Sequence, residues 1–344
     1  MNGKAQKLMF IGSLILAVAA LSGCAGTPEV AEMMQWPAPP LEPRIVYESS
    51  IAGSESLDRS FWGKINDFFF GKSQAHALGK PYGVALDAKG RLLLADTATK
   101  RVIILDFKSG HASTLESLGP HGRLAEPVNI LPEADGTVIV ADTGLQKLVV
   151  FDAEGRFDRF LGEGHLVSPV GMVRSRANGQ LYVVDAGAHQ VVVFAADGQF
   201  LHSFGGRGDM QGEFYHPLGI TITADDLVYV VDSFHFAVQI FDLAGQYVGS
   251  FGPVPTGMGS LARPRDVAFD SDGNLYVTDG LNNNVQVFSP DGVLLLKFGS
   301  QGYRAGQFRL PAGICVGEDD RIYVVDSINK RVQVFRYLPE TKEG

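Results

Sequence analysis

The 344-residue sequence predicts an all-β fold built from six copies of one unit. An aspartate that closes a short apolar run recurs once per copy, at Asp96, Asp142, Asp185, Asp232, Asp279 and Asp326. A proline precedes each aspartate by 15 residues, or by 16 in the third copy. Between these markers, β-branched runs alternate with turn dipeptides such as Asp135-Gly136, which is typical of hairpins. Units of about 45 residues with four strands each are typical of propeller blades, so we expect a six-bladed β-propeller.

The N-terminal segment has the pattern of a signal peptide. A short basic region precedes the mostly apolar run 8–20, which is too short to span ~30 Å of hydrocarbon as a helix. The next residues, Leu21-Ser22-Gly23-Cys24, resemble a bacterial lipobox. The resemblance implies that residues 1–23 are removed and that Cys24 is lipidated, with palmitate among its acyl chains, and Ala25 implies sorting to the outer membrane. An ordinary secretory signal with an incidental cysteine is the alternative.

Two segments lie between Cys24, the expected lipid anchor, and the repeats. Residues 24–43 contain five prolines and predict an extended tether. Residues 44–51 have the composition of a strand, whereas the sixth repeat supplies only three strands, ends near Tyr337 and leaves only the tail 338–344. We therefore expect 44–51 to be the outer strand of the last blade, so that one propeller domain spans 44–337 and no sheet edge stays open.

A helix is expected between the closing strand and the first blade. In residues 56–71, apolar side chains recur every three to four positions from Leu57 to Phe68, and Gly71 can end the helix. Such an amphipathic helix would pack on the outer wall or one face of the propeller. The alternative is contact with a partner or a membrane surface through Trp62 and its neighbours.

The repeats resemble the NHL repeat over about residues 80–337. Leu181–Asp185, Leu275–Asp279 and Asp326–Phe335 carry the pattern most closely. The resemblance implies a six-bladed propeller that starts its blades near residue 80. Some NHL-related propellers are enzymes, including an amidating lyase that holds zinc through histidines from separate blades.

Charge and cysteine content exclude several classes of protein. The net charge of -9 would repel a phosphate backbone, so we expect no nucleic-acid partner. Cys24 and Cys315 are the only cysteines, which excludes a disulfide framework, a C-x-x-C zinc motif and a C-x-x-C-H haem site. Cys315 lies in an apolar run and is expected in the core. We expect no cofactor.

The prolines and the repeated aspartates should share one face of the propeller, the proline face, at the mouth of the central channel. Most repeats place glycine two residues after the proline, but the second and fifth have Asn129 and Asp266. Arg265-Asp266 predicts either a polar anchor at the mouth or a local ion pair. The candidate binding residues on this face are Tyr82, Asn129, His189, His216, His235, Arg265 and Asp266.

Metal sites have weaker support in the sequence. The six repeated aspartates occur before turns, where aspartate commonly accepts backbone N–H groups, so a structural function is favoured. Asp270–Asn274 resembles the start of a calcium loop but lacks the downstream glutamate, and we expect a hairpin turn. The histidines of blades three and four could meet and bind zinc, although no H-E-x-x-H pattern fixes their geometry.

The sequence therefore favours a lipid-anchored, non-catalytic propeller with a monomeric body that binds an envelope protein or polymer. It would face the periplasm or the cell surface, and association with electron-transfer or export complexes is a further hypothesis. The alternative is a periplasmic metal-dependent lyase or hydrolase that uses the histidines on the proline face. A ligand-sensing or polysaccharide-binding module is a second alternative.

Overall fold

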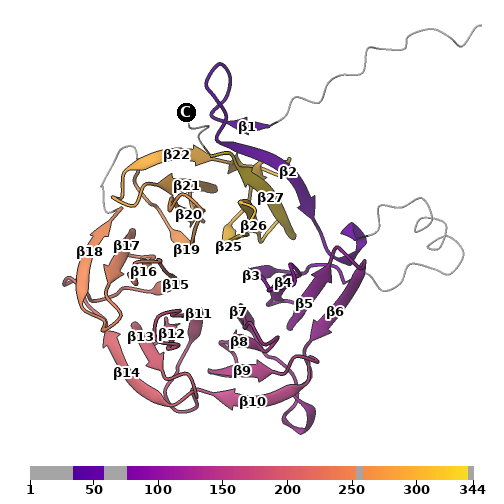
Figure 1. Cartoon of the computed structure of the whole chain (residues 1–344), viewed down its shortest axis with the longest axis vertical. Helices are drawn as coiled ribbons and strands as arrows, with labels where there is room; N and C mark the ends of the chain where they lie inside the picture. The colour runs from indigo at the N-terminus through magenta and orange to yellow at the C-terminus, as the bar shows by residue number, and fades with distance from the viewer. Residues whose placement is uncertain (1–33, 58–75, 253–258, 340–344) are drawn as a thin grey trace, which may run out of the picture. The chain divides into compact units, whose positions relative to one another are not determined.

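A computed structural model describes residues 34–57, 76–252 and 259–339. Six antiparallel sheets are arranged around a central axis, each contributing one blade (Figure 1). The predicted all-β, six-bladed propeller is confirmed. Two short 3-10 helices, Ser54–Ser56 and Gly119–His121, interrupt the strands. Within these residues no helix has the length and apolarity needed to cross a membrane.

Each blade repeats the same four strands. The innermost strands begin at the repeated prolines: β3 (Pro81–Leu86), β7 (Pro127–Pro132), β11 (Pro169–Arg174), β15 (Pro217–Ile222), β19 (Pro264–Phe269) and β25 (Pro311–Val316). The second strands end at the repeated aspartates: β4 (Leu92–Asp96), β8 (Val138–Asp142), β12 (Leu181–Asp185), β16 (Val228–Asp232), β20 (Leu275–Asp279) and β26 (Arg321–Asp326). Proline and aspartate are paired across the first two strands of every blade. The start of the first strand and the end of the second therefore share one face.

The third and fourth strands complete the blades. The third strands are β5 (Arg101–Asp106), β9 (Lys147–Phe151), β13 (Gln190–Phe194), β17 (Ala237–Phe241), β21 (Asn284–Phe288) and β27 (Arg331–Tyr337). The outer strands are β6 (His111–Leu115), β10 (Phe157–Leu161), β14 (Phe200–Gly205), β18 (Tyr247–Phe251), β22 (Leu294–Phe298) and β2 (Ile45–Ile51). Two short strands, β23 (Ser300–Gln301) and β24 (Gln307–Phe308), pair in the loop that enters blade six.

The ring closes between the two ends of the propeller domain. β2 pairs antiparallel with β27, from Ile45 opposite Tyr337 to Ile51 opposite Val332, and becomes the outer strand of blade six. β2 thus supplies the fourth strand that the sixth repeat lacks. In Figure 1 the indigo β2 lies beside the yellow β27, so a segment from the start of the chain covers the last blade.

The tether prediction is wrong for residues 34–43. β1 (Gln35–Trp36) pairs with β2, and the backbone N–H of Arg44 donates to the carbonyl of Trp36 at 2.7 Å. The Trp36 ring packs against Phe298 and Phe335, with ring centroids 5.9 and 5.8 Å apart. Proline content predicted an extended tether, but the packing of this partly buried aromatic ring holds the segment on blade six.

Several sequence predictions fall outside the described residues. These are the signal 1–23, Cys24 with the first part of the tether, and the end of the tail. Of the expected helix 56–71, only Ser56 and Leu57 are described, and Ser56 ends a 3-10 helix.

The core lies between neighbouring blades. Buried apolar residues form six clusters, one at each of the six blade junctions, including the junction between blades six and one. Cys315 packs at the edge of that last cluster, and burial raises the pKa of its thiol. Because each cluster takes side chains from two blades, no blade has a complete core of its own, and ring closure contributes directly to stability.

Candidate functional site

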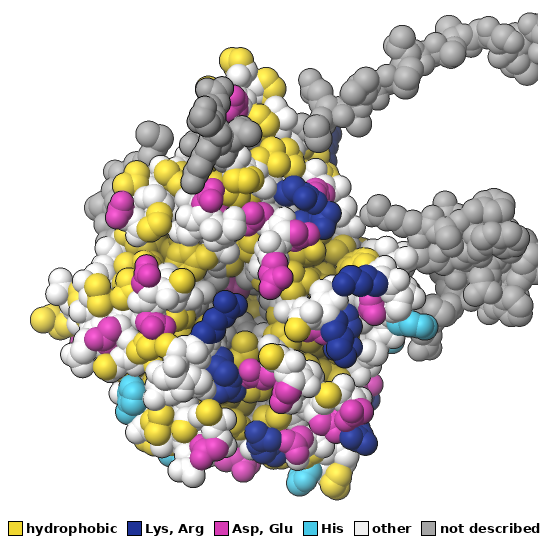
Figure 2. All heavy atoms as spheres, viewed as in Figure 1, with side chains coloured by type: hydrophobic (Ala, Val, Ile, Leu, Met, Phe, Trp, Pro, Cys, Tyr) yellow, Lys and Arg dark blue, Asp and Glu magenta, His cyan; other side chains and the backbone are white. Residues whose placement is uncertain are grey.

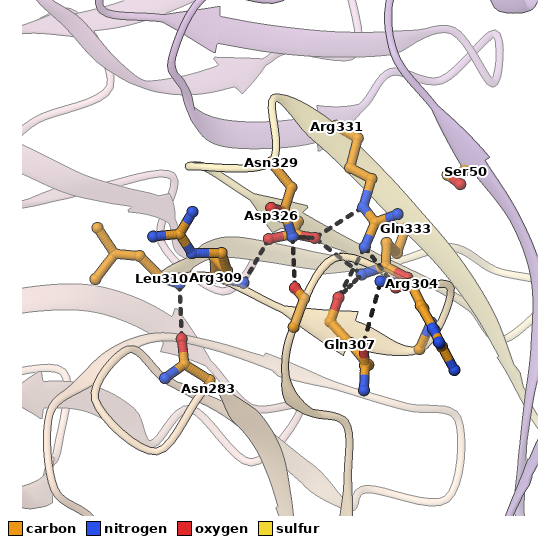
Figure 3. Close-up of polar contacts among 12 residues, drawn as sticks. Ser50, Asn283, Arg304, Gln307, Arg309, Leu310, Asp326, Asn329, Arg331 and Gln333 are labelled. Carbon is orange, nitrogen blue, oxygen red and sulfur yellow. Dashed lines mark hydrogen bonds and ion pairs between the residues drawn. The ribbon is translucent and has the colours of Figure 1, made fainter.

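The repeated aspartates hold the loops of the proline face in place. Asp326 is fully buried and accepts hydrogen bonds from the backbone N–H of Arg309 at 2.7 Å and from side chains of Asn329, Arg331 and Gln333 at 2.8, 2.8 and 3.0 Å (Figure 3). The other five are also fully buried, and each accepts a backbone N–H from the loop that precedes its proline. Each aspartate thus connects the loop entering a blade to the turn after its second strand.

A narrow cavity lies where the six innermost strands meet. Its lining residues come from the first two positions after the prolines: Tyr82, Gly83, Asn129, Val170, Gly171, Leu218, Gly219, Arg265, Asp266, Ala312 and Gly313. Its volume of about 10 Å³ is at the limit of what one ordered water molecule needs, ~10–15 Å³.

Close approach of the inner strands explains both the glycines and the small cavity. A Cβ atom on Gly171 would lie 2.3 Å from the Leu218 carbonyl oxygen of the next blade, and one on Gly313 would lie 2.6 Å from the Tyr82 carbonyl oxygen. Such distances are far below van der Waals contact, so these positions require glycine. The strands touch through their backbones and leave no room for an organic ligand.

Asp266 occupies one of the two positions where glycine is replaced. Its two carboxyl oxygens accept the backbone N–H groups of Val267 and Ile314, both at 3.0 Å, so the side chain bridges blades five and six. Thr278 adds a second bridge, because its hydroxyl donates to the Ala312 carbonyl at 2.7 Å. Burial raises the pKa of Asp266 to about 7, although the two N–H groups and Arg265 lower it.

Arg265 turns away from Asp266 and towards blade one. Its guanidinium group lies 5.1 Å from the centroid of the Tyr82 ring and donates to the Tyr82 hydroxyl at 3.2 Å. Within the described part of the chain its Nε–H has no hydrogen-bond partner. Of the two possibilities raised by Arg265-Asp266, the local ion pair is absent among the described contacts. Tyr82, Asn129, Arg265 and Asp266 come together around the cavity.

The three candidate histidines come together at a second place on the proline face. The backbone N–H of His216 donates to Nδ1 of His189 at 3.1 Å. His235 is held at both ring nitrogens, by Asp232 at 2.6 Å and by Asp209 at 3.2 Å. Burial opposes protonation of His235, but these carboxylates outweigh it and raise its pKa. Burial and the nearby His189, Arg263 and Arg265 lower the pKa of His216.

The donor geometry does not fit a bound metal ion. Across 34–57, 76–252 and 259–339, no three His, Cys, Asp or Glu side chains are placed to hold a metal together. His189 uses Nδ1 to accept a backbone N–H, and both nitrogens of His235 already contact carboxylates. The calcium-like segment 270–274 is a hairpin turn in which Asp270 accepts the N–H groups of Asp272 and Asn274.

Sequence reasoning missed an aromatic and arginine cluster beside the histidines. The Tyr215 ring stacks on His189 with a centroid distance of 6.0 Å, and the Phe234 ring stacks on His216 at 5.0 Å. Arg207 lies over Tyr215 at 5.5 Å, and Arg263 lies over Phe234 at 5.7 Å. The sequence feature that could have indicated this cluster is Phe234, an apolar residue in the turn directly after the repeated aspartate of blade four.

The fold and this geometry define a six-bladed β-propeller whose inner strands close on a small central cavity. Residues 161–343, just over half of the chain, match the family model described as the SMP-30/Gluconolactonase/LRE-like region. The chain belongs to this family. The finer resemblance to NHL repeats stays a prediction. Comparison with curated proteins finds no match.

Solved propeller structures resemble the chain at low sequence identity. A streptogramin B lyase is 15% identical, with a TM-score of 0.58 over 75% of this chain and 94% of that one. A gluconolactonase from Xanthomonas campestris is 18% identical, with a TM-score of 0.57 over 76% and 87%. An auxiliary nutrient binding protein from Bacteroides thetaiotaomicron is 20% identical, with a TM-score of 0.61 over 76% and 69%. Likeness at these identities establishes the fold alone.

Proposed function

We propose that this protein is a lipid-anchored envelope propeller that binds a protein or polymer through its proline face without catalysing a reaction. The observation that carries this proposal is the contrast between the central cavity and the loops around it. The cavity of about 10 Å³ has no room for a substrate, whereas Tyr215, Phe234 and Met210 are exposed on the loops. Exposed aromatic side chains and arginine are typical of recognition surfaces.

The anchor completes the proposal. The resemblance to a lipobox favours lipidation at Cys24, ten residues before Met34, where the described body begins. This supports an outer-membrane protein whose monomeric body faces the periplasm or the cell surface. Association with electron-transfer or export complexes belongs to the same proposal. The test is labelling of cells with radioactive palmitate. We expect the wild-type protein to incorporate the label and Cys24→Ser to incorporate none.

A catalytic function is the alternative, because structures similar to this one include proteins named as a lyase and a gluconolactonase. The sequence suggested a metal-dependent enzyme in which His189, His216 and His235 would hold the metal. The hydrogen bonds of these histidines do not fit such a metal site. Metal content of the purified full chain tests this alternative. Stoichiometric zinc that is lost in His216→Ala would overturn the binding proposal.

Photo-crosslinking in cells tests the binding function directly. A photoreactive amino acid is placed in the full chain at six exposed proline-face positions: 98, 126, 167, 210, 281 and 328. Matched controls are positions 89, 177 and 225, which are exposed in hairpin turns at the opposite ends of the strands. We expect discrete adducts from the proline face only. If no position yields an adduct, or if only the control positions do, the proposal is wrong.

A further inference from the structure

The proline face is divided into two chemically different halves. The residue two positions after the repeated aspartate lies at the tip of an exposed turn in every blade. In blades one to three this residue is Ala98, Gly144 or Gly187, and in blades four to six it is Phe234, Leu281 or Ile328. The three large side chains are 40%, 65% and 45% exposed. Large apolar side chains therefore occupy the turn tips of one half of the proline face, where the other half has alanine or glycine.

The same half carries three pairs of arginine and aromatic side chains. Arg207 lies over Tyr215 and Arg263 over Phe234, as described above. The third pair lies in the loop before blade six, where Arg309 is 4.8 Å from the centroid of the Tyr303 ring and donates to its hydroxyl at 2.7 Å. Stacking holds each guanidinium group in one orientation, so less conformational entropy is lost when it binds a further group.

These three arginines have no acidic partner. Among the described residues no carboxylate lies within ion-pair distance of them, whereas arginines elsewhere, such as Arg174 and Arg321, are paired with acids. Acidic side chains in this region have other partners: Asp209 and the buried Asp232 contact His235, and Glu213 accepts the Met210 N–H.

The local charge contrasts with the acidic protein as a whole. The net charge is -9, and basic and acidic side chains are interspersed over the face seen in Figure 2. Three unpaired guanidinium groups on one half of the proline face therefore form a local positive charge beside apolar side chains.

We propose that the arginine–apolar surface, formed by these three pairs, Met210 in the loop between Arg207 and Tyr215, and the turn tips Leu281 and Ile328, docks a partner protein through a segment that carries carboxylates beside an apolar side chain. The inference rests on the proposed binding function and names its partner class. Tyr, Phe, Met and Arg are enriched at the cores of protein interfaces, and Lys, Glu and Asp are depleted there.

A protein segment fits this surface better than a polysaccharide. The most exposed apolar residues on this half include the aliphatic Met210, at 74%, and Leu281, at 65%. Aliphatic side chains gain from contact with apolar side chains of a partner, whereas a sugar offers mainly hydroxyl groups to satisfy. Carboxylates of the segment would be recognised by the planar guanidinium groups.

The crosslinking strains described above distinguish this surface from the rest of the face. Positions 210, 281 and 328 lie on the arginine–apolar surface, and positions 98, 126 and 167 lie on blades one to three. We expect adducts from the first set and, by mass spectrometry, a crosslinked peptide with Asp or Glu close to the crosslink. In the triple variant Arg207→Glu, Arg263→Glu, Arg309→Glu the adduct yield should fall about tenfold or more.

Two control variants separate charge from folding. The triple variant loses three cation–π contacts and the Arg309–Tyr303 hydrogen bond but no ion pair of the described structure, so it should stay folded and melt within about 5 °C of the wild type. The matched Arg→Lys triple variant keeps the charge but loses the planar stacking, and we expect a loss of about threefold. Arg176→Glu reverses an exposed charge in a hairpin turn at the opposite end of blade three and should leave the yield unchanged.

Each result decides between the two proposals. Adducts from positions 98, 126 or 167 alone would overturn this inference and leave the binding function standing. An adduct that contains glycan and no peptide would do the same, in favour of a polysaccharide. Equal yields in the wild type and a folded Glu triple variant would also overturn the inference. No adduct from any position would overturn both proposals.

Discussion

The propeller should lose stability as the pH rises towards 8, and replacing Asp266 with Asn should remove this loss. Burial at the junction of blades five and six raises the pKa of Asp266 from its ordinary 3.8 to about 7. Between these two pH values the folded protein holds a proton that the unfolded chain has released. A rise in pH through this window therefore favours the unfolded chain. The stability associated with the protonated group is fully present below about pH 4 and lost as the pH passes about 7.

The magnitude follows from proton linkage. Each pH unit in which the folded state alone holds the proton changes the free energy of unfolding by ~1.4 kcal/mol. Integrated from pH 5 to pH 8 with these two pKa values, the loss is about 3 kcal/mol. For a folded body of this size the entropy of unfolding is ~0.6 kcal/mol/K, so the loss corresponds to about 5 °C in Tm.

Thermal unfolding followed by circular dichroism at pH 5, 6, 7 and 8 and constant ionic strength is the assay. Between pH 5 and pH 8 the wild-type Tm should fall about 5 °C further than the Tm of Asp266→Asn. Asp225→Asn is the matched control, because Asp225 is exposed in a hairpin turn, and it should follow the wild type. Parallel pH profiles for the wild type and Asp266→Asn would refute the reasoning.

Three further predictions concern the elements that build the proline face and close the ring. Asp326→Ala leaves four buried or partly buried donors without this acceptor and should cost about 4 kcal/mol, or about 7 °C in Tm, whereas Asp225→Ala should change Tm by less than about 1 °C. Gly171→Ala forces a Cβ against a backbone oxygen of the next blade and should cost about 2–3 kcal/mol in urea unfolding, while Gly249→Ala, with no atom within 4 Å of the new Cβ, should be nearly neutral. Deletion of 44–51 uncovers the edge of β27 and should lower Tm by about 8 °C or more; an unchanged melting curve would contradict the closing function of this strand.

Much of the fold could be predicted because its determinants are local. The proline that starts each inner strand and the aspartate that ends each second strand can be recognised within a single repeat, and six repeats imply a ring. The missing fourth strand of the sixth repeat pointed to 44–51. By contrast, residues 34–43 were predicted as part of an extended tether, because proline content says nothing of Phe298 and Phe335, the rings against which Trp36 packs.

The candidate site was predicted only as a set of residues on one face. The sequence indicated Asn129, Arg265 and Asp266 as departures from the repeat, but it left an anchor and an ion pair as equal possibilities. The partners that decide between them are Ile314 and Tyr82, which lie 48 and 183 residues away along the chain. The pairs of arginine and aromatic side chains were missed for the same reason, since they form between loops of different blades.

The sequence alone determined the six-bladed architecture and the face that carries the residues departing from the repeat. Tertiary structure decided the size of the cavity, the partners of Asp266 and the division of the proline face into two halves. The physical reason is the range of the interactions. Strand and turn patterns depend on neighbours a few residues apart, whereas ring closure sets the separation of the inner strands. At this separation, glycine lets two backbones touch and a buried carboxyl joins two blades.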